Sequence, residues 1–404
     1  MINIKISVII PTYNRLDILK KIIPYWILVD KKTKYKYELI FSDDGSVDDS
    51  LRFLESKKNK LPIKLIKNKH GGASNARNSG IKVARGDIIL FLGDDIFPSP
   101  NILNIHYDEF IKNGRVCAIL GDVVWHKSLK VNHLMKHITE IGLEQFSYAK
   151  LKNNSFVDFR HFYTCNISVP RFYFNGETDL FDKKFNEYGF EDIELGYRLY
   201  KKGLKIKYIK MPNMQHLHAY DVHGFIKRQF SAGKMAFVFM EIHPELKFLD
   251  QDEKMFKKIK VDDIYFDHIK NLINFSIRYE YFLDKQKVKF KKKYEPILSD
   301  IYFKLFSASY QVGFFMKKLK NESMSKAIYS YYLGQFNPRF LMKIGSNNNV
   351  ENFFESDFNH YDIFKCNFLE LVLGRIKIYI YLLFSNPGLF FNKLKFKLRG
   401  LIRK

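Results

Sequence analysis

The chain has 404 residues, of which 46% are apolar and 27% charged, and its formal net charge is +24. This length predicts more than one domain, and its three widely separated cysteines exclude a disulfide framework and a cysteine zinc site, which favours a reducing compartment. The charge suits polyanionic partners, but the basic residues are diffuse and no nucleic-acid-binding motif occurs, so nucleic acid is not expected as a partner. The amino terminus runs directly into an apolar segment, which predicts no signal peptide and a cytoplasmic protein.

Short apolar segments and helical patterns alternate through the first third of the chain. Strands are expected around 8–10, 37–41, 62–66 and 88–92, and helices around 16–26, 49–57 and 72–84. Such alternation predicts an α/β fold with a mainly parallel, right-handed sheet.

Two adjacent carboxylates, Asp94 and Asp95, follow the expected strand 88–92. In open α/β sheets, ligands bind beyond the carboxyl ends of the strands. Neighbouring ionised groups repel each other, and a divalent cation or hydrogen-bond donors can compensate them. The pair therefore indicates either a ligand site or a solvated turn.

Two further features suit a nucleotide. Asp44 lies at a strand end, where it can accept from a base or ribose, although a turn residue would also fit there. Gly71 and Gly72 open a helix whose free amides, with Arg77 on its first turns, suit a diphosphate. The full dinucleotide fingerprint and the Walker lysine motif are both absent.

Four segments follow one another along the chain: PTYNR at 11–15, SDDGS at 42–46, GGASNARNSGI at 71–81 and ILFLGDDI at 89–96. Together they resemble the donor-binding half of family 2 glycosyltransferases with the GT-A fold. The resemblance implies a nucleotide-diphosphate sugar donor, inversion at the anomeric carbon, and Mg²⁺ or Mn²⁺ as cofactor. It assigns donor binding to Pro11, Thr12, Tyr13, Arg15, Asp44, Gly72, Arg77 and Asp94. Asp95 matches the metal-ligating carboxylate, while Gly93 replaces the first acid of the family's acid-x-acid motif.

The segment FNEYGFEDIELGYRL at 185–199 places Glu191 and Asp192 at or before the first turn of a helix. Acids there stabilise the helix dipole, which is the simplest explanation for them. The segment also resembles the acceptor-side motif of the same family, which implies that Asp192 is the general base and Glu191 an acceptor ligand. The resemblance further implies a third metal ligand at His216, with His218 as the second choice.

From about residue 245 the chain changes to expected helices, such as 259–278 and 297–319, rich in Phe, Tyr and Lys. We therefore expect a GT-A domain at 1–245 and a mostly helical, basic, aromatic-rich domain at 246–404. Eight basic residues follow Glu370, around an uncharged stretch at 378–391 that is too short to span a bilayer. This tail suits either an anionic membrane surface or a core helix with a solvated basic face.

The function expected from these features is sugar transfer to a glycan or lipid-linked acceptor in cell-surface polysaccharide synthesis, at the inner face of the cell membrane. The alternatives are a sugar nucleotidylyltransferase and a non-catalytic, polyanion-binding relative. The first would need a glycine-rich basic loop where this chain has Pro-Thr-Tyr-Asn-Arg. The second alternative, a non-catalytic relative, stays open because Gly93 replaces an acid of the acidic motif.

Overall fold

The computed structural model describes residues 3–176, 180–246 and 288–321, together with scattered positions between 273 and 285. Residues 3–246 and 306–321 belong to one compact unit, and the described positions from 273 to 305 belong to a second. The expected helix at 259–278 falls mostly outside the described residues, and the basic tail lies entirely outside them.

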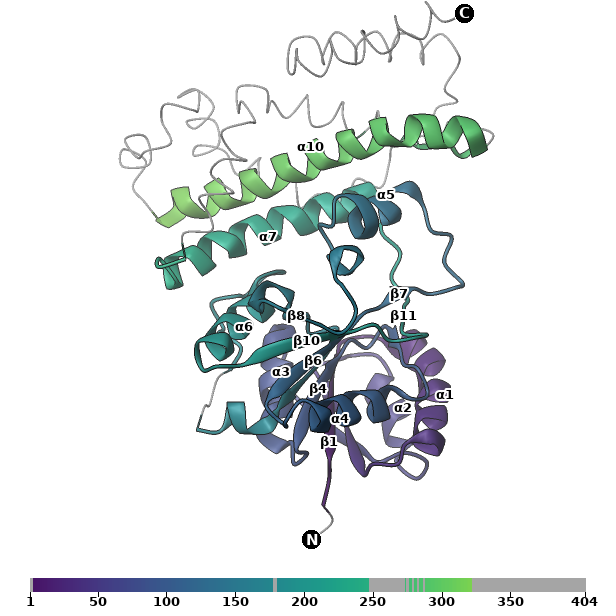
Figure 1. Cartoon of the computed structure of the whole chain (residues 1–404), viewed down its shortest axis with the longest axis vertical. Helices are drawn as coiled ribbons and strands as arrows, with labels where there is room; N and C mark the ends of the chain where they lie inside the picture. The colour runs from purple at the N-terminus through teal and green to yellow at the C-terminus, as the bar shows by residue number, and fades with distance from the viewer. Residues whose placement is uncertain are drawn as a thin grey trace, which may run out of the picture. The chain divides into compact units, whose positions relative to one another are not determined.

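An eight-stranded sheet forms the centre of the first unit (Figure 1). In spatial order its strands are β3 (Ile63–Lys67), β2 (Tyr37–Asp43), β1 (Ile6–Thr12), β4 (Ile88–Leu92), β9 (Asn166–Pro170), β6 (Cys117–Gly121), β10 (Lys205–Ile209) and β8 (Ser155–Val157). Neighbouring strands are parallel, except that β9 is antiparallel to β4 and β6, and β8 is antiparallel to β10. The predicted mainly parallel sheet is confirmed, and β4 and β6 point in the same direction on either side of β9.

Helices cover both faces of this sheet because alternate strand residues point to opposite sides. The helices are α1 (Leu16–Lys32), α2 (Ser50–Glu55), α3 (Gly72–Val83), α4 (Ile102–Lys112), α5 (His133–Lys136), α6 (Glu191–Lys201) and α7 (Val222–Ile242). Apolar side chains of α1, α2 and α4 pack with Ile6, Val8 and Ile10 on one face. On the other face, Ile9 packs in a second apolar cluster that includes Leu195 and Leu199 of α6.

Helix α1 shows how the sequence produces this packing. Its buried residues Leu19, Ile22, Ile23, Trp26 and Val29 recur at helical spacing and form one apolar face. The helix continues six residues beyond the predicted end at residue 26, because Val29 extends the same buried face.

A small second sheet lies beyond the carboxyl end of β4. It pairs β11 (Gln215–His216) with both β5 (Ile96–Phe97) and β7 (Val124–Trp125), and its register places His216 opposite Ile96. The backbone amide of Leu217 also donates to the carbonyl oxygen of Asp95 at 2.9 Å. This pairing brings the segment that carries the two histidines to the strand end that carries the two aspartates. Short helical segments complete the unit: η1 (His137–Ile141), η2 (Tyr148–Lys150), η3 (Phe159–His161) and η4 (Arg171–Phe174).

Helix α10 (Val288–Asn321) contains the predicted helix 297–319, and its residues 306–321 lie in the same unit as α7. Two glycines allow the backbones to meet. A Cβ on Gly233 of α7 would overlap the carbonyl oxygen of Tyr310, and one on Gly313 would overlap that of Phe230. Residues 306–321 thus belong to the unit that carries the sheet, so the boundary expected at 245/246 remains a proposal. Among the described helices, none has both the length and the apolarity required to cross a bilayer.

Candidate active site

A cleft of about 680 Å³ lies at the carboxyl ends of β1, β2 and β4. This is the edge at which open α/β sheets bind their ligands. All of the predicted site residues except Gly72 line this cleft. Residues more than 200 positions apart in the chain therefore share one cavity.

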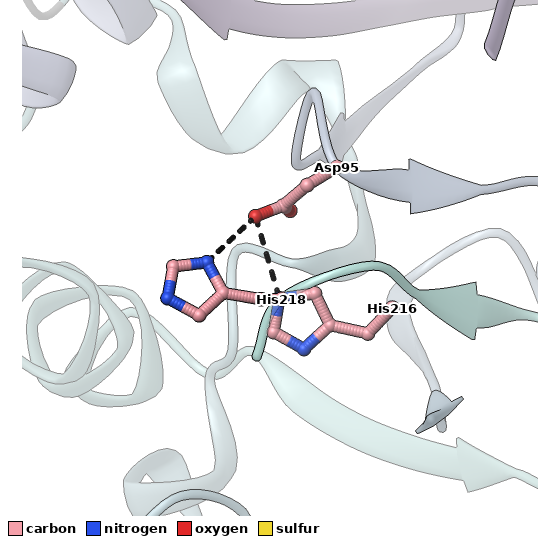
Figure 2. A group of neighbouring side chains, drawn as sticks. All are labelled: Asp95, His216 and His218. Atoms are coloured by element: carbon pink, nitrogen blue, oxygen red, sulfur yellow. Dashed lines mark hydrogen bonds and ion pairs between the residues drawn. The ribbon is translucent and has the colours of Figure 1, made fainter. Parts of the chain in front are cut away.

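Asp95, His216 and His218 form a compact cluster of metal-ligating groups in this cleft (Figure 2). The Oδ2 atom of Asp95 lies 3.4 Å from His216 Nε2 and 3.4 Å from His218 Nδ1. One ligand atom from each of the three lies within 4.8 Å of the others. Atoms that each bind one ion at about 2.0–2.2 Å are separated by comparable distances, so the donor set fits a divalent cation. Both histidines belong to the cluster, because the extended backbone directs their rings to the carboxylate of Asp95.

The two adjacent aspartates have different electrostatic surroundings. Burial alone would raise the pKa of Asp95, but hydrogen bonds and positive charge from His216 and His218 lower it below its usual range. Burial and the charge of Asp95 raise the pKa of Asp94 to about 7, against the opposing effect of Arg15. The Nε atom of Arg15 lies 3.6 Å from Asp94 Oδ2. Arg15 thus lies next to Asp94, the carboxyl group that does not belong to the cluster of Asp95, His216 and His218.

The structure corrects one expectation about the start of α3. The amides of Gly71 and Gly72 are not free for a diphosphate, because they donate to Asp44 Oδ1 and Oδ2 at 2.9 and 2.8 Å. His70 Nδ1 lies 2.9 Å from the same carboxylate. Asp44 therefore fixes the beginning of this helix, an attraction that the helix dipole favours. Donor binding by Asp44 and Gly72 stays a prediction.

Glu191 and Asp192 begin α6, as the sequence predicted. Burial and the charge of Glu191 raise the pKa of Asp192 to about 7, although Arg77 opposes this shift. The Nη1 atom of Arg77 lies 3.5 Å from Glu191 Oε1, and the amide of Ile193 donates to Asp192 Oδ1 at 2.8 Å. A carboxyl whose pKa lies near neutrality is suited to exchange protons with a substrate hydroxyl.

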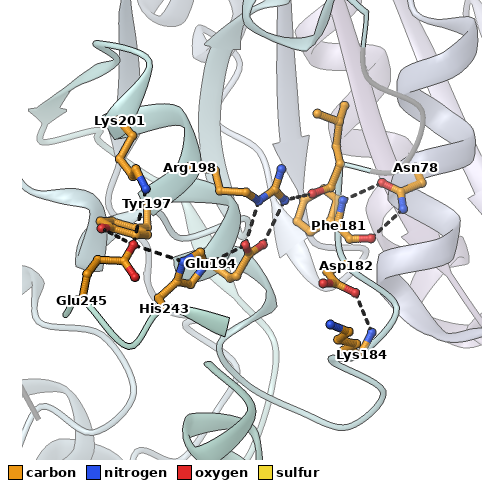
Figure 3. A network of polar contacts seen from close by, with 11 residues as sticks. Asn78, Phe181, Asp182, Lys184, Glu194, Tyr197, Arg198, Lys201, His243 and Glu245 are labelled. Carbon is orange, nitrogen blue, oxygen red and sulfur yellow. Dashed lines mark hydrogen bonds and ion pairs between the residues drawn. The ribbon is translucent and has the colours of Figure 1, made fainter. Parts of the chain in front are cut away.

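A buried network holds the helix that carries Asp192 (Figure 3). Arg198 donates through Nε and Nη2 to the two oxygens of Glu194 at 2.7 and 2.9 Å, and His243 Nε2 lies 3.0 Å from Glu194 Oε1. Arg198 also contacts the carbonyl oxygen of Leu180. Next to this, Asn78 of α3 exchanges two hydrogen bonds of 2.9 Å with the backbone of Phe181. The network thereby connects α6 to α3, which carries Arg77, and to the end of α7.

Several further residues line the cleft. Arg228 of α7 lies with its guanidinium carbon 3.6 Å from the centre of the Tyr188 ring, and both residues line the cleft. Gln145, Phe146 and, from α10, Tyr310 also line it. From the sequence, Lys227 and Arg228 indicate either a contact to phosphate or, as the simpler interpretation, a solvated basic helix face. No local pattern distinguishes Gln145, Phe146 or Tyr310 from ordinary loop and helix residues.

The fold and the cleft define a GT-A glycosyltransferase domain, in which a mostly parallel sheet presents a strand-end aspartate and a helix-borne acid pair to one cavity. Residues 7–175 match the family model described as glycosyl transferase family 2. Residues 7–175 are therefore similar to family 2 glycosyltransferases, and the match lies within the first half of the chain. This match favours glycosyl transfer over the nucleotidylyltransferase alternative.

Curated relatives include two polysaccharide synthases. The chain is 30% identical over 234 residues to a hyaluronan synthase of Pasteurella multocida, which covers 51% of this chain and 24% of that protein. It is 30% identical over 226 residues to a chondroitin synthase of Escherichia coli, which covers 49% of this chain and 32% of that protein. The chain thus spans a third or less of the length of these relatives. A crystal structure of S. aureus TarS 1–349 in complex with UDP aligns with 79% of this chain and 91% of that one, at a TM-score of 0.41 and 16% identity.

Proposed function

We propose that the protein is an inverting, metal-dependent glycosyltransferase that moves a sugar from a nucleotide-diphosphate donor to a glycan or lipid-linked acceptor. The observation that carries this proposal is one cleft lined by three residues that can hold a cation and by Asp192, a half-buried acid whose pKa is raised to about 7. These are the two groups that single displacement requires: one for the leaving group and one for the attacking hydroxyl.

On the donor side, Asp95, His216 and His218 would hold the cation. A bound divalent cation stabilises the negative charge that develops on a diphosphate leaving group. Imidazole ligands are typical of transition metals, whereas Mg²⁺ prefers oxygen ligands and water. Of the two cofactors expected, the donor set therefore favours Mn²⁺. Arg15 and Asp94, which face each other in the same cleft, are proposed to contact the donor.

On the acceptor side, Asp192 is proposed to accept the proton of the attacking hydroxyl, and Glu191 to contact the acceptor. A sugar hydroxyl is a weak nucleophile, so its attack needs a base within hydrogen-bond distance. Arg77 supports this arrangement because it lies beside Glu191 and opposes the rise in the pKa of Asp192. In a single displacement the configuration at the anomeric carbon inverts, and no enzyme nucleophile is required.

We extend the proposal to cell-surface polysaccharide synthesis at the inner face of the cell membrane. Its support is the similarity to synthases of hyaluronan and chondroitin, together with the basic residues beyond Glu370. Those residues lie outside the part of the chain that the structure describes, so this extension rests on sequence alone.

The test is release of nucleoside diphosphate that depends on both a cation and an acceptor. UDP-, GDP-, dTDP- and ADP-sugars are first screened for thermal stabilisation with and without Mn²⁺. Each stabilising donor is then incubated with a panel of oligosaccharides and lipid-linked saccharides, while diphosphate release and product configuration are followed.

Acceptor-dependent release with an inverted product is the expected result. Stabilisation by no donor, or release of pyrophosphate instead of nucleoside diphosphate, would contradict the proposal. Donor binding without transfer to any member of the panel would favour the non-catalytic alternative.

A further inference from the structure

A second hollow of about 340 Å³ lies beside the cleft. It is lined by Asp122 and Lys210, the residues that directly follow β6 and β10. Because β6 and β10 are parallel to each other and to β4, this hollow opens at the same sheet edge as the cleft. Phe146 and His216 line both cavities and therefore form the partition between them.

The walls of this hollow combine aromatic rings with polar groups. Trp125 stacks on His216 with ring centres 5.6 Å apart and planes 16° apart, and Tyr148 stacks on Tyr208 at 6.1 Å and 19°. The Nε1 atom of Trp125 is buried and has no hydrogen-bond partner among the described residues.

The polar groups of the hollow match the hydroxyls of a sugar. Asp122 is buried and its Oδ1 accepts from the Met211 amide at 2.6 Å, while the side chains of Glu140 and Lys210 lie at more exposed positions. Carboxylates accept hydrogen bonds from hydroxyls, and an ammonium donates to them. Aromatic faces pack against the apolar face of a sugar ring, and the volume suits a small ligand. The hollow has two carboxylates, Asp122 and Glu140, and one ammonium group, that of Lys210. The excess negative charge would repel an acidic sugar, so these groups favour an uncharged ring.

We propose that this hollow, at the ends of β6 and β10, is a subsite for an uncharged pyranose ring of the acceptor glycan. The inference rests on the proposed function and deepens it by assigning a substrate class to a place outside the cleft. The donor-binding residues lie at the ends of β1, β2 and β4, so a ring beside Trp125 belongs to the other substrate. His216 then belongs to the cation cluster and also forms part of the wall of the acceptor subsite.

Tryptophan fluorescence tests the subsite directly. The chain has two tryptophans, Trp26 and Trp125, and Trp26 is completely buried in the core. A sugar that binds in the hollow therefore alters the emission of Trp125 alone. The full chain is titrated with methyl β-D-glucopyranoside, methyl N-acetyl-β-D-glucosaminide and methyl β-D-glucuronide, with uridine as a non-sugar comparison. At least one neutral glycoside should give a saturable change, and it should act at lower concentration than the glucuronide.

A matched pair of variants assigns that change to the hollow. Ala149 lines the hollow and is exposed, whereas the nearby exposed Lys152 does not line it. Ala149→Phe should raise the half-saturating concentration at least tenfold, and Lys152→Phe should leave it unchanged. Thermal stabilisation by Mn²⁺ with the nucleoside diphosphate should be the same in both variants as in the parent.

The outcomes separate this inference from the proposed function. If Mn²⁺ and nucleotide stabilise the protein but no neutral glycoside alters the emission, the subsite is wrong while the donor site stands. A response to uridine alone, a stronger response to the glucuronide, or an equal loss in both variants would also overturn it. A response to a neutral glycoside that Ala149→Phe removes would support the subsite even if no diphosphate were ever released.

Discussion

Asp94 and Asp95 are neighbours in the chain, yet the fold gives them opposite tendencies to ionise. The two histidines lower the pKa of Asp95, whereas burial and the charge of Asp95 raise that of Asp94 to about 7. At neutral pH Asp95 is an anion within the cation cluster, and Asp94 is partly protonated beside Arg15. The two carboxyl groups are therefore expected to respond differently to the same substitution.

Asp95→Asn should weaken Mn²⁺-dependent nucleotide binding by at least about tenfold, because it removes the only charged oxygen ligand of the cluster. Asp94→Asn, an identical change one residue away, should weaken binding less. Isothermal titration of the nucleoside diphosphate with and without Mn²⁺ measures both variants. Equal affinity in Asp95→Asn and the parent protein would remove Asp95 from the set of metal ligands.

The activity should depend on pH through Asp192. Burial and Glu191 raise the pKa of this carboxyl to about 7, and only its ionised form can accept a proton. The turnover at saturating donor should therefore fall about tenfold for each pH unit below 7 and level off above it. Asp192→Asn should lower turnover by about 10²–10⁴-fold with little change in donor affinity.

Glu191→Gln offers a sharper check on that assignment. It removes the neighbouring negative charge that raises the pKa of Asp192, so the fall in turnover should move to lower pH. An acid limb that keeps its position in this variant, or that persists in Asp192→Asn, would mean that another group titrates.

For single residues, the sequence indicates which side chains belong to the candidate site better than it indicates which of them are in contact. The strand-end and helix-start positions of Asp95 and Asp192 follow from local patterns, which is why both could be predicted. The hydrogen bonds from Gly71 and Gly72 to Asp44 could not, because they join residues 27 and 28 positions apart whose approach depends on the packing of β2 against the loop after β3. The same holds for Trp125, whose stacking on His216 depends on the register of the small sheet.

The helix that carries Asp192 depends on the charge network centred on Glu194. Glu194 is buried and pairs with both Arg198 and His243. Removing one partner of a buried pair leaves an uncompensated charge and costs about 3–5 kcal/mol. Glu194→Ala should therefore lower the free energy of unfolding by about that amount and reduce turnover as well, because α6 loses its attachment to α7.

Glu55→Ala is a suitable control for this substitution. Glu55 forms an exposed pair with Lys58, and pairs of this kind contribute about 0–1 kcal/mol. Denaturant unfolding followed by the emission of Trp26 and Trp125 reports on the unit that contains both. If the two glutamate variants unfold at the same denaturant concentration, the network does not stabilise α6.

Strand direction was the part of the sheet that the sequence left undetermined. Apolar runs such as 88–92 identify strands, but the same run fits a parallel or an antiparallel neighbour. Strand β9 inserts antiparallel between β4 and β6, and its entry places Thr164 and Cys165 in the cleft. The predicted alternation of strands and helices is correct for the first four strands and does not extend to β9, because β9 follows irregular structure instead of a crossover helix.

For the whole chain, the basic tail predicts association with acidic membranes. Each Lys or Arg near an anionic surface contributes about 1 kcal/mol, and eight such residues follow Glu370. Deleting residues 371–404 should release the protein from phosphatidylserine vesicles at low salt without reducing transfer to a soluble acceptor. Co-sedimentation over a range of salt concentrations measures this. If the intact chain remains in the supernatant at low salt, the tail serves another purpose.

The glycine contacts between α7 and α10 bear on how this enzyme could be recombined with its relatives. Tyr310 reaches the cleft from α10, and the close approach at Gly233 and Gly313 leaves no room for a larger residue at either position. A chimera joined at residue 245, where the composition changes, would keep the motifs but lose Tyr310 from the lining of the cleft. A chimera made to exchange substrate preference between such enzymes should therefore include α10 together with the domain whose cleft Tyr310 lines.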